Sequence, residues 1–323
     1  MASIRSRLTE YRSSIKSFDT EEKIDLYFYR PIGHLLAKIA VPLKLTPTNL
    51  SLIGLVSGLL SGFCFIWSAS LIPFMFGAFF LIFAGLLDSA DGQLARLTGR
   101  STRLGIMLDG ICDSVVFASA YLGAAIAAYG KNGAGIFLVA ILGLICHSFH
   151  SSLLDFFNRE YLYFGYGKTA NEDNWNPTIK EAWTEYETSL TPKERIFTFL
   201  RYLWTWPQHL LAGRTDRERM ALKLKLRTFT PRQKERFTRS YRLCNRRMIR
   251  LWRFMGANFH TIAFLLFVFI GQFNWYLIYI DILFLNVMVF ILSYTQRKLD
   301  MRLYEDFAVG AHSGSDYWRD LLL

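Results

Sequence analysis

The sequence predicts an all-α, polytopic membrane protein with six transmembrane helices, an amphipathic juxtamembrane helix and a cytoplasmic helical insertion. Hydrophobic residues make up 52% of the 323 residues and charged residues only 20%, which excludes a disordered or highly charged soluble chain. The apolar residues are also gathered into stretches of about 20, the length that a helix needs to cross a bilayer. Six stretches reach or approach that length: 49–69, 71–97, 104–129, 133–157, 255–271 and 275–294.

The first segment, residues 1–45, is expected to be cytoplasmic. Its first thirty residues are polar and mixed in charge, and they contain no apolar core of the kind that a signal peptide has. Residues 27–45 are amphipathic but are interrupted by Pro31 and Pro42, so this stretch is too short to cross a bilayer. We expect it to lie on the cytoplasmic surface of the membrane.

Residues 46–157 carry the first four spans and residues 251–295 the last two. Between them, residues 158–250 form a basic insertion that is cytoplasmic or interfacial, and residues 296–323 form a cytoplasmic tail. Two helix starts are visible in the insertion, where a capping Thr, a Pro at the first helical position and a Glu or Gln follow in order. They are Thr191-Pro192-Lys193-Glu194 and Thr230-Pro231-Arg232-Gln233. The first of these helices mixes aromatic and basic residues, which is typical of a helix lying in the membrane interface.

The distribution of Lys and Arg predicts the orientation. The turns at 68–70 and 271–275 contain neither residue, and the turn at 129–133 contains only Lys131. The insertion, by contrast, has twice as many basic as acidic residues. The positive-inside rule therefore places both termini and the insertion in the cytoplasm, at a bacterial inner membrane or an equivalent one. Anionic lipid headgroups explain the net charge of +11, and no nucleic-acid partner is expected.

Four aspartates lie in the second and third spans, where an ionisable side chain indicates a functional site. They are Asp88, Asp91, Asp109 and Asp113. Spacings of three and four residues place each pair on one face of its helix, and both pairs lie at the cytoplasmic ends. Carboxylates facing each other repel unless cations neutralise them. Their oxygens suit Mg²⁺ or Mn²⁺, and a pair of such ions usually serves phosphate chemistry. Ion pairs with Arg96, Arg100 and Arg103 are the structural alternative.

Small residues accompany these aspartates. Gly92 follows Asp91 directly, and Ala95 lies one turn further along the same helix. Gly105 precedes Asp109 by one turn. Because side chains are missing or short at these positions, a groove can open in which a flat nucleotide or a diphosphate approaches the backbone.

These residues form the pattern Asp88-x2-Asp91-Gly92-x2-Ala95-Arg96-x8-Gly105-x3-Asp109-x3-Asp113. The pattern resembles the signature of the CDP-alcohol phosphotransferases, a family of integral membrane enzymes that make phospholipids. The resemblance covers roughly residues 46–160. Thr46-Pro47-Thr48-Asn49-Leu50-Ser51 is also similar to the family's start of span one, with Thr48 where Asn is usual.

The resemblance implies an enzyme that displaces CMP from a CDP-linked group with an acceptor hydroxyl. It implies that the four aspartates hold two divalent ions, with Asp109 and Asp113 as catalytic carboxylates and Asp113 as the base for the hydroxyl. The cytidine diphosphate would be lined by Gly92, Ala95, Arg96, Gly105, Thr48 and Ser51. It also implies a homodimer surrounded by membrane lipids.

Members of the family use either a CDP-lipid with a small polar acceptor, or CDP-choline or CDP-ethanolamine with a lipid acceptor. The motif does not separate the two. We expect a phosphatidyl transfer from CDP-diacylglycerol to inositol, inositol phosphate or glycerol phosphate. A phosphorylated acceptor could be bound by guanidinium groups, which match a phosphate, and these same groups could instead only anchor helix ends to lipid headgroups. The candidate arginines are Arg100, Arg103, Arg159, Arg297 and Arg302. The alternatives are the CDP-choline or CDP-ethanolamine type and, from another class, an ion-coupled transporter.

Two further sets of polar residues lie in the later spans. The polar end of span four carries His147, Asp155 and Arg159, which could contact the acceptor or only make interfacial hydrogen bonds. In span six, Asp281 and Asn286 lie away from the cytoplasmic end. We interpret them as partners in hydrogen bonds between helices.

Overall fold

The computed structural model describes residue 11 and residues 17–100, 103–167, 177–212 and 216–307. All regular elements within these residues are helices. Six segments are long and apolar enough to cross a membrane, namely Pro47–Phe65, Leu71–Thr98, Leu108–Asn132, Gly135–Tyr166, Pro231–Phe269 and Phe273–Asp306. The predicted fold class and the six spans are therefore confirmed, although the fourth helix continues past its expected end at residue 157.

The chain divides into two compact units. Unit 1 comprises residues 1–148 and 257–283, and unit 2 comprises residues 149–256 and 284–323. Unit 1 contains η1 (Asp25–Tyr29), α2 (Arg30–Ala40), α3 (Pro47–Phe65), α4 (Leu71–Thr98), α5 (Arg103–Asn132), the first part of α6 (Gly135–Tyr166), α11 (Ala257–Phe269), α12 (Phe273–Trp275) and most of η4 (Tyr276–Leu285). Unit 2 contains the rest of α6 and η4, together with α7 (Ile179–Glu187), α8 (Pro192–Ala212), α9 (Asp216–Thr228), α10 (Pro231–Trp252), η3 (Arg253–Met255) and α13 (Asn286–Asp306).

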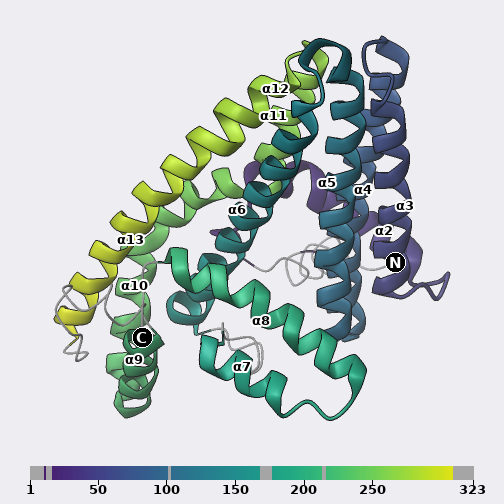
Figure 1. The fold of residues 1–323 in the computed structure, drawn as a ribbon. Coiled ribbons are helices and arrows are strands. Elements are labelled where there is room, and N and C mark those ends of the chain that lie inside the picture. The colour runs from purple at the N-terminus through teal and green to yellow at the C-terminus, as the bar shows by residue number, and fades with distance from the viewer. Residues whose placement is uncertain (1–10, 12–16, 101–102, 168–176, 213–215, 308–323) are drawn as a thin grey trace. The chain divides into compact units, whose positions relative to one another are not determined.

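In unit 1, α3 lies beside both α4 and α5 (Figure 1). The buried residues of α3 are mostly small, and they include Gly54, Ser57, Gly58, Ser61 and Gly62. The Ser61 hydroxyl donates to the Gly77 carbonyl of α4 at 2.8 Å, and Ser57 makes the same kind of bond one turn earlier. Toward α5, a Cβ atom on Gly62 would stand 2.1 Å from Ser119 Oγ. Small residues allow helices to approach closely in a membrane, and here they set the positions of α4 and α5 around α3.

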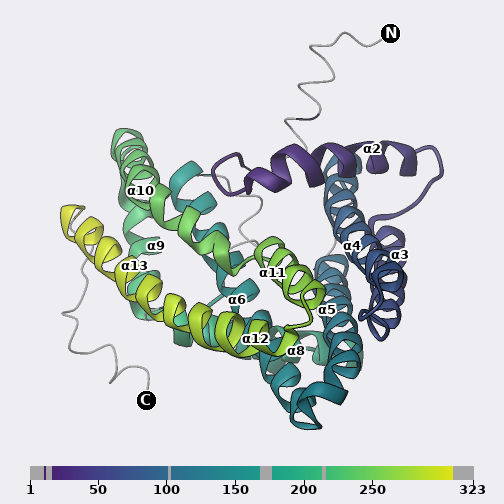
Figure 2. The same ribbon diagram turned by 90° about the horizontal axis from the view of Figure 1, so that it is seen from above.

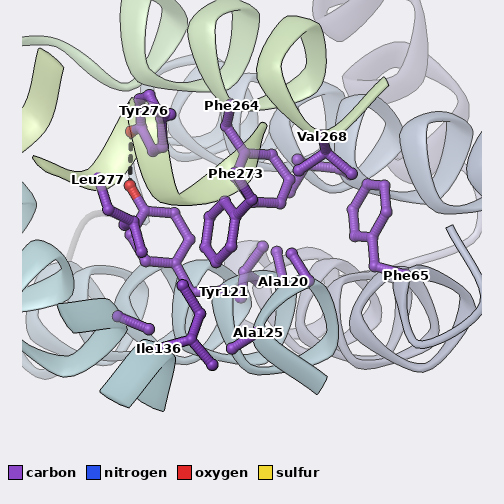
Figure 3. Packing of buried hydrophobic residues seen from close by; sticks show 14 of the residues in the cluster. Phe65, Ala120, Tyr121, Ala125, Ile136, Phe264, Val268, Phe273, Tyr276 and Leu277 are labelled. Carbon is purple, nitrogen blue, oxygen red and sulfur yellow. Dashed lines mark hydrogen bonds between the residues drawn. The ribbon is translucent and has the colours of Figure 1, made fainter. Parts of the chain in front are cut away.

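An aromatic cluster joins the early helices of unit 1 to residues 257–283 (Figure 3). Phe65 of α3, Tyr121 of α5 and Phe264 of α11 are each at most 1% exposed. The rings of Tyr121 and Phe264 stack with their centroids 5.4 Å apart. The Tyr121 hydroxyl also shares a hydrogen bond of 2.6 Å with the Tyr276 hydroxyl. The core of unit 1 is therefore completed by a segment that follows the first spans by about a hundred residues.

Polar groups continue from Tyr276 into the same buried region. Its hydroxyl lies 2.8 Å from His260 Nδ1, and that nitrogen lies 3.8 Å from Asp281 Oδ1. His147 stacks on His260 with ring centroids 3.9 Å apart. His260 belongs to α11 and Asp281 to η4, so Asp281 approaches a residue of another helix, but 3.8 Å is longer than a hydrogen bond. That Asp281 and Asn286 form hydrogen bonds between helices stays a prediction.

Helix α2 runs across α4 (Figure 2). Its buried residues are Gly33, Ala37 and Ala40, and the two alanines pack in one cluster with residues of α4. Leu35 and Ile39 on the other side are exposed. The predicted amphipathic helix is confirmed, but its small-residue face packs on protein rather than on lipid.

In unit 2, α7 and α8 form a helical hairpin (Figure 1). Arg201 of α8 pairs with Glu185 of α7 at 2.8 Å. Both predicted helix starts are confirmed: Thr191 and Glu194 cap the start of α8 reciprocally, and Thr230 does the same with Gln233 at α10. The apolar residues that α8 exposes are Ile196, Phe199, Leu200, Leu203 and Trp206.

Candidate active site

The four aspartates project from two neighbouring helices of unit 1, since α4 carries Asp88 and Asp91 and α5 carries Asp109 and Asp113. One carboxylate oxygen from each of Asp88, Asp91 and Asp109 lies within 4.8 Å of the others. Asp91 is only 4% exposed, whereas Asp88 and Asp109 are half-buried. Asp113 does not belong to this group of three, and its side chain is exposed. It is nevertheless close enough to interact electrostatically with all three.

Placing three ionised carboxylates this close together costs electrostatic free energy unless a positive charge lies nearby. At this separation each pair of ionised carboxylates repels by about 3 kcal/mol, if the effective dielectric constant is about 20. Carboxylate oxygens are also the ligands that hard divalent cations prefer. The three residues therefore fit a divalent cation, and the predicted clustering of Asp88, Asp91 and Asp109 is seen in the structure.

The start of α3 adds a fourth side chain to this group. The Ser51 hydroxyl donates a hydrogen bond to Asp91 Oδ2, and both residues are buried. The helix start is fixed by a capping box in which the Asn49 side chain accepts from the Thr46 backbone N–H at 2.8 Å. Ser51 therefore contacts the candidate metal ligand itself, and Asn49 is used as a cap. Thr48 belongs to the same first turn of α3 and is half-buried.

The space that Gly92 leaves by having no side chain is occupied by the guanidinium group of Arg96. A Cβ atom on Gly92 would stand 3.4 Å from Arg96 Nη1, so the guanidinium folds back over the glycine. Arg96 interacts electrostatically with Asp91 and Asp88. Ala95 lies between these two positions in the sequence and is half-buried. The helix then ends at Gly99, whose positive φ of 65° favours glycine.

The remaining candidates have varied positions. Gly105 is half-buried on α5, one turn before Asp109. Arg100 is exposed at the end of α4, and the side chain of Arg103 lies outside the described residues. In unit 2, Arg159 pairs with Asp155 at 2.7 Å.

The sequence carries no signal for one charged pair that interacts with this site, Glu21 and Arg30. Arg30 interacts electrostatically with Asp88, and its guanidinium binds Glu21. The amphipathic pattern around residues 27–45 predicts a surface helix and carries no spacing signal for a contact with α4. Only the tertiary packing reveals this pair.

Residues 42–179 match the model of a protein family described as CDP-alcohol phosphatidyltransferase. The matched stretch contains all four aspartates, Ser51 and Arg96. No curated protein matches the chain.

Proposed function

We propose that the protein transfers a phosphatidyl group from CDP-diacylglycerol to a small polar alcohol. The premise is that residues 42–179 belong to the CDP-alcohol phosphatidyltransferase family, whose model they match. The acceptor is of the inositol, inositol phosphate or glycerol phosphate type, and CMP is released. The observation that carries this proposal is the approach of Asp88, Asp91 and Asp109 oxygens to within 4.8 Å of one another. Membership in a transferase family favours an enzyme over an ion-coupled transporter.

The four aspartates Asp88, Asp91, Asp109 and Asp113 would hold two ions of Mg²⁺ or Mn²⁺. When bound, such ions neutralise the diphosphate of the donor and the departing CMP. The hydrogen bond from Ser51 occupies one oxygen of Asp91 and thereby orients the other. Outer partners of this kind fix the direction of a metal ligand.

The residues beside the carboxylates would bind the cytidine diphosphate. The Arg96 guanidinium can offer two parallel N–H donors to a phosphate, and Gly92 leaves the space in which it lies. In this proposal Ala95, Gly105 and Thr48 line the same groove. Because little covalent chemistry is left to the protein in phosphoryl transfer, this positioning supplies most of the rate.

Asp113 would act as the general base. The acceptor oxygen attacks the phosphorus of the phosphatidyl group, the bond from that phosphorus to the CMP oxygen breaks, and the hydroxyl proton passes to the Asp113 carboxylate. The exposure of Asp113, outside the group of three aspartates, supports this second role beside its part in holding the ions.

The test is release of CMP by the purified protein in mixed micelles with CDP-diacylglycerol, Mg²⁺ and a panel of polar alcohols. Asp91→Asn keeps the side-chain volume but removes a ligand charge, and we expect it to slow the reaction by more than about 100-fold. Asp306→Asn is the matched control, because Asp306 is exposed in unit 2. EDTA is expected to stop the reaction, and Mg²⁺ or Mn²⁺ to restore it.

Two results would contradict the proposal. Near-normal turnover by Asp91→Asn would show that Asp91 is not an essential metal ligand and would contradict the proposed metal site. Release of CMP from CDP-choline or CDP-ethanolamine with diacylglycerol, but from no CDP-diacylglycerol mixture, would establish the alternative with a lipid acceptor. The proposed homodimer is tested on the same sample from the mass of the protein in its micelle.

A further inference from the structure

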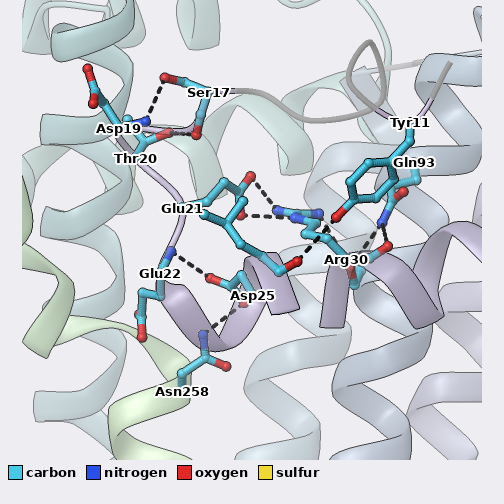
Figure 4. A network of polar contacts seen from close by, with 12 residues as sticks. Tyr11, Ser17, Asp19, Thr20, Glu21, Glu22, Asp25, Arg30, Gln93 and Asn258 are labelled. Atoms are coloured by element: carbon cyan, nitrogen blue, oxygen red, sulfur yellow. Dashed lines mark hydrogen bonds and ion pairs between the residues drawn. The ribbon is translucent and has the colours of Figure 1, made fainter. Parts of the chain in front are cut away.

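A buried ion pair anchors the N-terminal segment of unit 1 (Figure 4). Arg30 Nε donates to Glu21 Oε2 at 2.9 Å, and Arg30 Nη2 lies 2.9 Å from Glu21 Oε1. The two side chains are only 17% and 5% exposed. The geometry is the two-pronged pairing that guanidinium and carboxylate groups prefer, so the charges face each other away from solvent.

The same pair is fixed against α4. Arg30 Nη1 lies 3.4 Å from Ser89 Oγ, and the Gln93 side chain donates to the Arg30 carbonyl at 2.9 Å. Helices α2 and α4 pack closely at this contact, because a Cβ atom on Gly33 would stand 2.8 Å from Ser89 Oγ. Ser89 follows Asp88 directly in the sequence. The ion pair therefore packs on the turn of α4 that carries Asp88.

The charges of this pair act on the residues of the candidate site. Arg30 interacts electrostatically with Asp88. Arg96 interacts with both members of the pair, with Arg30 unfavourably and with Glu21 favourably. Burial alone would lower the pKa of Arg30, but the Glu21 carboxylate raises it above its usual value, so the guanidinium stays charged. Buried charges are screened far less than exposed ones.

We propose that Glu21 and Arg30 are positioning residues that set, through Arg96 and Asp88, the balance between anion affinity and cation affinity at the candidate site. Arg30 and Arg96 repel each other electrostatically, and two such positive charges together attract a phosphate and repel a divalent cation. Glu21 neutralises the charge of Arg30, so Arg30 does not repel the metal ion. The positive charge of Arg96 then remains available to bind the phosphate of the substrate. The inference rests on the proposed function for the nature of both ligands.

The test uses CMP and Mn²⁺ as probes, with the full chain in detergent micelles. Binding of CMP is measured by calorimetry, and binding of Mn²⁺ by the electron paramagnetic resonance signal of the free ion. Removing the negative charge in Glu21→Gln is expected to tighten CMP binding and to weaken Mn²⁺ binding, each by about tenfold, or ~1.4 kcal/mol. Arg30→Gln is expected to shift both affinities in the opposite directions.

Two further variants separate electrostatics from loss of structure. The double variant Glu21→Gln with Arg30→Gln replaces a neutral ion pair by a neutral pair of amides, and both affinities are expected to return to within about threefold of the wild-type values. Glu22→Gln is the matched control, since it removes the same charge at the next residue, whose backbone N–H bonds to Asp25. It is expected to change neither affinity by more than about twofold.

A purely structural clamp gives a different pattern. If the pair only holds α2 on α4, Glu21→Gln and Arg30→Gln weaken both CMP and Mn²⁺ binding together, and the double variant is no better than the single ones. That result overturns the inference and leaves the proposed function intact. If the wild-type protein binds neither CMP nor Mn²⁺, the proposed function fails and the inference fails with it.

Discussion

Absent side chains shape the candidate site as much as the aspartates do. Gly92 leaves the space into which Arg96 folds, and Gly33 lets the N-terminal helix approach Ser89 closely. Ser51 adds a single hydroxyl beside Asp91. Because the two glycines leave space for neighbouring side chains, substitutions at Gly92 and Gly33 test the geometry of the site without removing a charged group.

Gly92→Leu is expected to lower the affinity for the CDP-linked donor by about tenfold or more. Its Cβ atom would stand 3.4 Å from Arg96 Nη1, and the rest of the side chain would push the guanidinium away from the groove. The measurement is CMP binding by calorimetry. Gly130→Leu is the control, because nothing lies within 4 Å of a Cβ atom there. Unchanged binding by Gly92→Leu would show that Gly92 serves only helix packing.

The pKa of the Asp25 side chain predicts that the stability of the protein depends on pH. Burial raises the pKa of Asp25 above its usual value, although the hydrogen bond from Asn258 at 2.9 Å lowers it. A raised pKa means that the folded protein holds this proton more tightly than the unfolded chain. The stabilisation is therefore complete below about pH 4 and is lost as the pH rises through the raised pKa.

The measurement is thermal unfolding in detergent from pH 4 upward, for the wild type and Asp25→Asn. The wild-type melting temperature, taken relative to that of Asp25→Asn, is expected to fall across this window and then to level off. A difference that rises with pH would mean that hydrogen bonding to the carboxylate outweighs its burial.

At the scale of elements, α3 acts as the spacer of the candidate site. It contributes the Ser51 hydroxyl to the group around Asp91, and its buried small residues determine how closely α4 and α5 approach it. The separation of the carboxylates on those two helices therefore depends on a third helix. Stability and metal affinity should respond together when this spacing is changed.

Gly62→Ala is expected to destabilise the protein by about 1–3 kcal/mol and to weaken Mn²⁺ binding. The added Cβ atom would stand 2.1 Å from Ser119 Oγ and 2.4 Å from the Ser119 carbonyl oxygen, so α5 must move. Gly54→Ala is the matched control on the same helix, because its nearest neighbour would be Leu87 Cβ at an ordinary 3.5 Å. Equal melting temperatures for the two variants would contradict the spacer role.

The elements were predictable where one physical rule dominates. The spans follow from the length of their apolar stretches, and the caps at Thr191 and Thr230 follow from local hydrogen bonding. The pairing of aspartates on helix faces follows from helical periodicity. The contact between Arg30 and α4 does not follow from any such rule, because it depends on how Gly33 packs against Ser89.

At the scale of the whole molecule, the six candidate spans within the described residues predict that the two described ends of the chain lie on one side of the membrane. From the positive-inside rule we expect this side to be the cytoplasm. Two exposed basic residues mark the opposite ends of neighbouring spans in unit 1: Arg100 after α4 and Lys131 near the end of α5. Their accessibility from either side is therefore a direct readout of orientation.

In a variant whose native cysteines are replaced by alanine, Lys131→Cys is expected to react with a membrane-impermeant thiol reagent in right-side-out vesicles. Arg100→Cys is expected to react only in inverted vesicles. The reagent distinguishes the two sides because it does not cross the bilayer. The reverse labelling pattern would place the candidate active site on the outer side.

The discontinuity of unit 1 has a consequence for biosynthesis. The face of Tyr121 and Phe65 is covered by Phe264 and Tyr276, which are translated only after the roughly 100 residues between positions 148 and 257. At a synthesis rate of about 5–20 residues per second, the face of Tyr121 and Phe65 stays uncovered for about 5–20 s until Phe264 and Tyr276 are synthesised. During this interval the aromatic surface of the first helices is open to lipid, to other nascent chains and to membrane chaperones. The ribosome therefore finishes the four aspartates well before the core that supports them has closed.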